Sequence, residues 1–143
     1  MDKALSDTAH KIAALAREMA VHGKDREDPA REVMGLLGDR WSTLILLVLE
    51  TGAWRHAELR RTLAQLSAEQ AISQRVLTLK LRTLERDGFV HRTVSDDTPP
   101  KVTYTLTPLG LELQREARRL IDWINARTQA IHAARATFDR SEN

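Results

Sequence analysis

The sequence predicts a mainly helical fold with a small β-hairpin wing, arranged as a winged helix-turn-helix. Three observations lead to this fold class: an apolar segment at residues 44–49, a helical pattern with one basic face at residues 73–87, and two β-branched runs on either side of a proline-containing turn at residues 95–101. With a short helix before the basic one, these elements follow the order of a winged helix-turn-helix.

The first third of the chain predicts two helices. Over residues 4–20, apolar side chains recur at helical spacing among polar ones, which is typical of an amphipathic helix. A charged linker follows at residues 22–27. Asp28 and Pro29 then have the residue types of a helix N-cap and first helical position, so a short helix is expected from there to Gly38.

The middle of the chain predicts a core helix and a short one. Residues 39–50 carry apolar side chains most of the way round a helix, so we expect this helix to be buried, with Gly52 ending it. Trp54 and Arg55 are expected to form a short strand, and residues 56–63 a short helix.

The helix expected at residues 73–87 has two unlike faces. Leu77, Leu81 and Leu84 share one face because they are spaced by four and three residues. The opposite face carries Arg75, Leu79, Arg82 and Arg86, flanked by Thr78. The leucine face is expected to pack on the core, which leaves the basic face in solvent.

A hairpin and one long helix are expected to complete the fold. Residues 89–94 and 102–106 are rich in β-branched and aromatic residues, which predicts two strands. Thr107 and Pro108 have the residue types that start a helix, and an apolar stripe predicts a single helix over residues 108–135, with a frayed tail after Ala136.

The composition excludes several classes of function. The chain has no cysteine, which excludes disulfides, thiolate metal sites and thiol-based redox sensing. The five histidines lack ligand spacing and no glycine-rich phosphate loop occurs, so no metal, cofactor or catalytic site is predicted. No apolar run is long enough to span a bilayer and no signal sequence is evident, so we expect a cytoplasmic protein.

The charge is concentrated where a nucleic-acid surface would need it. Residues 54–92 contain eight Lys or Arg and four Asp or Glu, a net charge of +4, whereas the whole chain carries +2. Because a helix fits the major groove of DNA, the exposed face of the basic helix is expected to reach base edges and phosphates. The predicted contacts to double-stranded DNA are Ser73, Gln74, Arg75, Thr78 and Arg82 on that helix, Arg60 and Arg61 on the preceding helix, and Arg92 and Lys101 on the wing.

Several segments in this order resemble the HxlR-type winged-helix regulators of bacteria, a MarR-like family. The resemblance covers about residues 28–123. It rests on the segments Leu37-Gly38-Asp39-Arg40-Trp41, Arg55-His56-Ala57-Glu58-Leu59-Arg60-Arg61, Ile72-Ser73-Gln74-Arg75-Val76-Leu77-Thr78, Leu81-Arg82-Thr83-Leu84-Glu85-Arg86-Asp87-Gly88, Pro99-Pro100-Lys101-Val102-Thr103-Tyr104 and Leu106-Thr107-Pro108-Leu109-Gly110, with Trp123 beyond them.

The resemblance implies a homodimeric transcription regulator, repressor or activator, on an inverted-repeat operator. Residues 1–27 would serve dimerisation, residues 28–107 would bind DNA, and residues 108–143 would form a C-terminal dimerisation helix and tail. The amphipathic terminal helices fit this role, because their stripes exceed what a small wing domain covers. The expected interface residues are Ile12, Leu15, Met19, Leu113, Leu120 and Ile124.

The sequence also departs from the family. Members commonly have a cysteine near Asp28, and the stretch 64–71 is longer here than the usual short turn, with Ser67-Ala68-Glu69-Gln70 typical of a capping box that would add a small helical extension. Two alternatives stay open. The winged helix could instead bind proteins without specific DNA binding, or the regulator could respond to a small-molecule effector in a pocket near the dimer helices, with Trp41, Trp54 and Trp123 as candidate lining residues.

Overall fold

The computed structural model describes residues 2–39, 41–67 and 71–143. The chain divides into two units, residues 1–40 and residues 41–143. The first contains α1 (Asp2–His22) and α2 (Pro29–Leu37), as the sequence predicts. Asp28 precedes α2 with extended backbone, but its carboxylate accepts a hydrogen bond from the Asp25 backbone N–H at 3.0 Å and so closes the linker turn. The division into functional segments made from the sequence stays a prediction.

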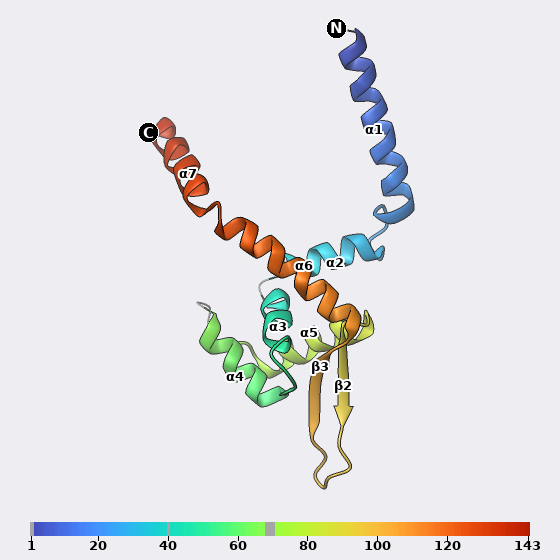
Figure 1. The fold of residues 1–143 in the computed structure, drawn as a ribbon, viewed down its shortest axis with the longest axis vertical. Coiled ribbons are helices and arrows are strands. Elements are labelled where there is room, and N and C mark those ends of the chain that lie inside the picture. The colour runs from blue at the N-terminus through green and yellow to red at the C-terminus, as the bar shows by residue number, and fades with distance from the viewer. Residues whose placement is uncertain (1, 40, 68–70) are drawn as a thin grey trace. The chain divides into compact units, whose positions relative to one another are not determined.

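The second unit carries the helix-turn-helix and the wing (Figure 1). Its elements are α3 (Ser42–Leu49), β1 (Trp54–Arg55), α4 (His56–Leu66), α5 (Gln74–Arg86), β2 (Val90–Val94), β3 (Val102–Leu106), α6 (Pro108–Asn125) and α7 (Thr128–Glu142). The predicted order of core helix, short helix, basic helix and hairpin is confirmed.

The three strands form one antiparallel sheet in the order β1-β3-β2. In the hairpin, Val90 pairs with Leu106 and Val94 with Val102. On the other edge of β3, Trp54 pairs with Tyr104 and Arg55 with Thr103. The short strand that the sequence predicts therefore anchors the start of α4 to the middle of β3.

Leucines from α3, α4 and α5 make the core of this unit. The side chains that are less than 2% exposed are Ile45, Leu46, Leu59, Leu63, Leu77, Leu81 and Leu84. The three on α5 are the leucine face predicted from spacing alone, so that prediction is confirmed. Burial of each such side chain stabilises the fold by about 1.5–3 kcal/mol relative to leaving it exposed, which fixes which face of α5 turns outward.

The end of α5 is joined to the start of α6 through backbone contacts. Gly88 takes φ +85° and its N–H donates to Glu85, while the Phe89 N–H donates to Leu84, the two hydrogen bonds of a Schellman motif. The Phe89 carbonyl in turn accepts from the Thr107 N–H at 3.0 Å. Thr107 also caps α6, because its Oγ1 accepts from the Gly110 N–H at 2.9 Å.

The C-terminal segment differs from its prediction. The sequence predicts one helix over residues 108–135 and a frayed tail, but the chain forms α6, a break at residues 126–127, and α7, which continues to Glu142. At the break the Arg127 guanidinium donates to the Trp123 carbonyl at 3.1 Å and lies 4.2 Å from the Trp123 ring centroid. The Thr128 hydroxyl donates to the Asn125 carbonyl at 3.1 Å. These side chains satisfy carbonyls at the end of α6. The apolar stripe continues on both sides of residues 126–127, so it could not reveal the break.

Two further features concern the stretch before α5 and membrane-spanning helices. The capping box and helical extension around Ser67–Gln70 fall mostly on residues outside the described part of the chain. Among the described residues, no helix is long and apolar enough to cross a membrane.

Candidate nucleic-acid interface

The start of α5 is fixed by Ser73, where the sequence places it. Ser73 has extended backbone and its Oγ accepts a hydrogen bond from the Val76 N–H at 3.1 Å. This cap satisfies one of the N–H groups that a helix leaves unpaired at its first turn. The other N–H groups of that turn remain a suitable site for a phosphate oxygen.

The outward face of α5 presents polar side chains to solvent. Gln74, Arg75 and Arg82 are exposed, and within the described part of the chain no side chain or carbonyl holds their polar groups. Apolar Val76 and Leu79 lie exposed on the helix as well, Leu79 at 53%. Such a mixture of free donors with an apolar contact is what reading base edges and thymine methyl groups requires.

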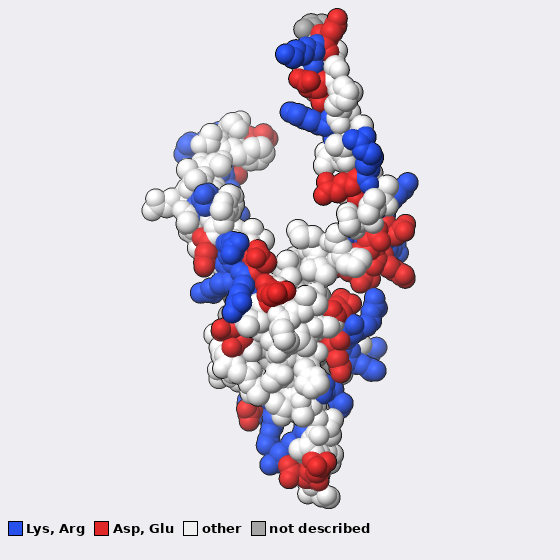
Figure 2. Space-filling view, turned by 45° about the vertical axis from the view of Figure 1, so that its right-hand side comes forward, with Lys and Arg blue, Asp and Glu red and all other residues white. Residues whose placement is uncertain are grey.

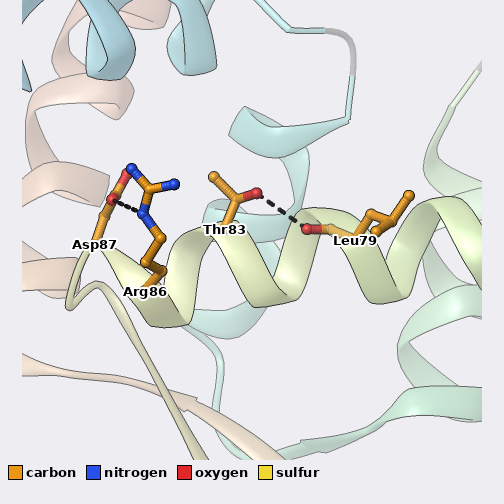
Figure 3. Close-up of polar contacts among 4 residues, drawn as sticks. All are labelled: Leu79, Thr83, Arg86 and Asp87. Atoms are coloured by element: carbon orange, nitrogen blue, oxygen red, sulfur yellow. Dashed lines mark hydrogen bonds and ion pairs between the residues drawn. The ribbon is translucent and has the colours of Figure 1, made fainter. Parts of the chain in front are cut away.

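The far end of α5 is built differently (Figure 3). There the Arg86 guanidinium pairs with the Asp87 carboxylate at 3.7 Å, and the Thr83 hydroxyl donates to the Leu79 carbonyl at 3.1 Å. In both interactions a polar side chain is held by a partner on α5 itself or at its C-terminal end. Of the unpartnered donors, Gln74 and Arg75 lie in the first turn of α5, the end that reads bases in a helix-turn-helix, and Arg82 lies about one turn before Arg86.

Thr78 lies on the flank of this face and is half-buried. Its hydroxyl donates to the Gln74 carbonyl at 2.9 Å and lies 3.0 Å from Nε2 of His56 on α4, from which it accepts. Burial lowers the pKa of His56, the nearby Arg60 guanidinium lowers it further, and a hydrogen bond with the Gln74 backbone opposes both. His56 is therefore neutral at pH 7. Thr78 remains a predicted DNA contact, but its hydroxyl also joins α4 to α5.

The two arginines predicted on α4 have different surroundings. Arg60 Nε donates to the Ile72 carbonyl at 2.9 Å, so the side chain ties α4 to the segment that leads into α5. Arg61 is exposed, with no partner within the described residues. Because the Ile72 carbonyl occupies only Nε, the outer edge of the Arg60 guanidinium still has N–H donors for a phosphate.

The wing carries one predicted cation on β2 and one at the foot of β3. Arg92 is exposed on β2, and Lys101 closes the hairpin, where its backbone N–H donates to the Ser95 Oγ at 2.9 Å. The loop between them contains Asp96 and Asp97, both exposed. Figure 2 shows this mixture at the lower end of the molecule, with acidic side chains at the tip and basic ones just above.

Two hollows bring residues of the helices and the wing together. One of about 410 Å³ is lined by Thr78, Arg82, Glu85, Arg92 and Tyr104, so Arg82 of α5 and Arg92 of β2 share it. Another of about 600 Å³ has Arg55 and Lys101 on its lining. Arg55 was not among the predicted contacts. Its basic side chain was the only signal, because the pairing of β1 with β3 that brings it to the wing is not local in sequence.

The residues predicted for the dimer interface fall into an exposed group and one partly buried residue. Ile12, Leu15 and Met19 on α1, and Leu120 and Ile124 on α6, are between 42% and 59% exposed. Leu113 is partly buried within its own chain. No residue of α1 is buried, so within its own unit the described residues leave its apolar stripe uncovered.

The candidate effector and metal groups are dispersed. Trp54 Nε1 donates to the Thr51 hydroxyl at 3.0 Å, and Trp123 is exposed beneath Arg127. None of the three tryptophans lines the two hollows beside the wing. Among the residues that the structure describes, no group of three His, Asp or Glu could hold a metal ion.

Comparison with known proteins identifies several relatives. The model of the HxlR-like helix-turn-helix family matches residues 36–132. The chain is 36% identical over 107 residues to the uncharacterized transcriptional regulator YtfH of Escherichia coli, covering 75% of this chain and 80% of that protein. It is 36% identical over 115 residues to the uncharacterized regulator YdeP of Bacillus subtilis, covering 78% and 85%.

Solved structures agree with these matches. The putative transcriptional regulator YtfH from Salmonella typhimurium superimposes with a TM-score of 0.63 at 35% identity, covering 78% of this chain and 95% of that one. The redox regulator HypR in its reduced form gives a TM-score of 0.62 at 32% identity, covering 73% and 98%. The family match contains all of α5 and the wing, where the unpartnered basic side chains lie.

Proposed function

The chain belongs to the HxlR-like helix-turn-helix family of transcriptional regulators, and we propose that it acts as a homodimer on an inverted-repeat operator. In this proposal α5 enters the major groove and the wing approaches the neighbouring backbone. The family is one of transcriptional regulators and not of enzymes.

The observation that carries the proposal is the free donor set on α5. Gln74, Arg75 and Arg82 are exposed, and the described part of the chain offers them no partner, whereas Arg86 is paired with Asp87. Arginine forms bidentate hydrogen bonds with guanine, and glutamine does so with adenine. Arg61, Arg92 and Lys101, with the outer edge of Arg60, are proposed to hold phosphates and so set the docking angle.

The alternative is a winged helix that binds proteins and has no specific DNA affinity. The salt dependence of binding to a duplex from the DNA upstream of its own gene separates the two, because phosphate contacts release counterions. A dimer that neutralised eight phosphates, four per protomer, would show a slope of about −7 in log affinity against log salt. A slope near zero would favour protein binding.

The wing allows the prediction of a substitution that raises DNA affinity. Asp96 and Asp97 lie between Arg92 and Lys101, and their carboxylates would repel the phosphates that the wing approaches. We expect the double substitution Asp96→Asn and Asp97→Asn to raise DNA affinity several-fold at low salt, with the gain shrinking as salt is added. Fluorescence anisotropy across a salt series measures this. Unchanged affinity at low salt would mean that the wing tip stays away from DNA.

Dimerisation is supported by the uncovered apolar stripes. Leu5, Ile12, Leu15 and Met19 recur at helical spacing along the 21 residues of α1, and no residue of that helix is buried. On α6, Leu120, Trp123 and Ile124 are exposed on one side. We propose a second copy of the chain as the partner, because an operator of two symmetric half-sites requires two recognition helices related by a two-fold axis.

We expect the double substitution Leu15→Glu and Met19→Glu to convert the dimer to a monomer. Charges placed on this stripe would be buried unpaired in the interface, while the exposed positions leave each protomer's fold intact. Analytical ultracentrifugation should show the mass falling from twice 16.2 kDa to 16.2 kDa. The control is Arg17→Glu, which lies two residues from both sites on a different face of α1. A variant that stayed dimeric would exclude α1 from the interface.

A further inference from the structure

A hollow lies between α3 and α6, apart from the DNA-binding face. Its volume is about 610 Å³, within the range of sites that hold small molecules. Its lining residues are Leu47 and Glu50 from α3, and Gln114, Arg115, Arg118, Arg119 and Asp122 from α6. Both helices belong to the same unit of the chain, so the hollow does not depend on how the two units are placed.

Gln114 is the unusual member of this lining. It is only 7% exposed, and its side-chain amide has no hydrogen-bond partner within the described part of the chain. No completely enclosed side-chain nitrogen or oxygen among the described residues lacks a partner, so the amide's polar atoms retain some exposure, and Gln114 is one of the residues that line the hollow. A largely buried amide without a partner on the lining of a hollow is suited to hydrogen-bond a ligand there.

The charges around Gln114 favour a negatively charged ligand. Three arginines against two carboxylates give the lining a net charge of +1. Arg118 Nε lies 3.7 Å from the Asp122 carboxylate, and Arg119 lies 3.8 Å from Glu116. Arg115, the neighbour of Gln114, has no such partner among the described residues. Its planar guanidinium matches a carboxylate in a bidentate geometry.

Much of the hollow's lining lies on a different side of α6 from Leu120 and Ile124. Arg118 precedes Leu120 by two residues and Asp122 precedes Ile124 by two, which places each about 160° away around the helix. Arg119 lies four residues before Trp123, about 40° away, so this side of the hollow borders that tryptophan. A dimer formed through Leu120 and Ile124 would therefore leave the hollow open to small molecules.

We propose that this hollow binds a small organic carboxylate. Arg115 holds the carboxylate, the Gln114 amide donates a further hydrogen bond, and Leu47 contacts the apolar part of the molecule. The proposal concerns binding alone and does not depend on the DNA-binding function, so either can fail without the other.

The test is isothermal titration calorimetry of the full chain with sodium benzoate and sodium hexanoate, with benzamide as the uncharged counterpart of benzoate. We expect at least one carboxylate to bind with a dissociation constant in the millimolar range or tighter, and to raise Tm by several degrees at ten times that concentration. Benzamide should bind at least tenfold more weakly.

The variants assign the site. Arg115→Gln should weaken carboxylate binding about tenfold or more, and because Arg115 is exposed it should leave the circular dichroism spectrum unchanged. Arg135→Gln on α7 removes the same charge outside the hollow and should bind like the parent. Absence of binding by both carboxylates, equal binding of benzamide, or equal loss in the two variants would each overturn the proposal.

Discussion

Replacement of Arg75 and Arg82 by alanine should weaken operator binding by about 30-fold or more while the protein stays folded. Each arginine is exposed and has no partner among the described residues, so its removal costs the fold little. A base contact by such a side chain contributes about 1–3 kcal/mol, and residues seven positions apart on a helix are about 10 Å from each other, far enough for their effects to add. Fluorescence anisotropy with the operator duplex measures the loss.

The matched control for that experiment lies on the same helix. Arg86→Ala also removes one positive charge from α5, but Arg86 lies at the C-terminal end and pairs with Asp87 (Figure 3). We expect it to weaken operator binding only a few-fold. If the Arg75 and Arg82 double variant bound as tightly as the parent, or no more weakly than the Arg86 variant, the recognition face would be assigned wrongly.

Gly110→Ala should be the most destabilising single methyl addition among the glycines of the chain. A Cβ atom built at Gly110 would lie 1.9 Å from the Phe89 carbonyl oxygen. That oxygen cannot simply move aside, because it accepts the 3.0 Å hydrogen bond from the Thr107 N–H that joins the wing to α6. Overpacking against a fixed backbone, with loss of this hydrogen bond, should lower the free energy of unfolding by about 3 kcal/mol or more. Thermal unfolding should show a Tm lower by about 10 °C.

Gly35→Ala is the control for the added methyl group. Gly35 is in α2, and a Cβ there would meet nothing within 4 Å among the described residues. Alanine is favoured over glycine in a helix by about 0.5–1 kcal/mol, so Tm should stay the same or rise slightly. A Gly110→Ala variant as stable as the Gly35→Ala variant would contradict the close contact between α6 and Phe89.

The sequence was sufficient to predict the elements whose signal is local. Leucines three and four residues apart predicted which face of α5 is buried, and Ser73 and Gly88 predicted where the helix begins and ends. The hairpin followed from two β-branched runs around a polar turn. Each of these features depends on residues close together in the chain, so it can be predicted from the sequence alone.

The remaining features depend on contacts that the order of residues does not reveal. At the division between α6 and α7, Arg127 reaches back to Trp123, and this contact lies within an apolar stripe that reads as one continuous helix. Arg60 was predicted to contact DNA, and the structure adds its hydrogen bond to Ile72, twelve residues away. The role of Gln114 could not be predicted either, since a polar residue on an exposed-looking helix gives no sign of burial.

The absence of cysteine limits how this regulator could be controlled. Relatives with solved structures include proteins described as redox regulators, yet this chain has no thiol to oxidise. Control by a bound small molecule, if the hollow between α3 and α6 serves that end, would act through α6, which packs directly on α3 of the core. Measuring operator affinity with and without benzoate would test that link.

A DNase I footprint on the DNA upstream of its own gene tests the central claim most directly. The account predicts two protected half-sites of inverted sequence, with centres about one helical turn or a multiple of it apart, and loss of both in the Arg75 and Arg82 double variant. A footprint that the double variant leaves unchanged would contradict the assignment of α5 as the recognition helix. No protection there, with no salt-dependent DNA binding, would contradict the operator-binding proposal itself.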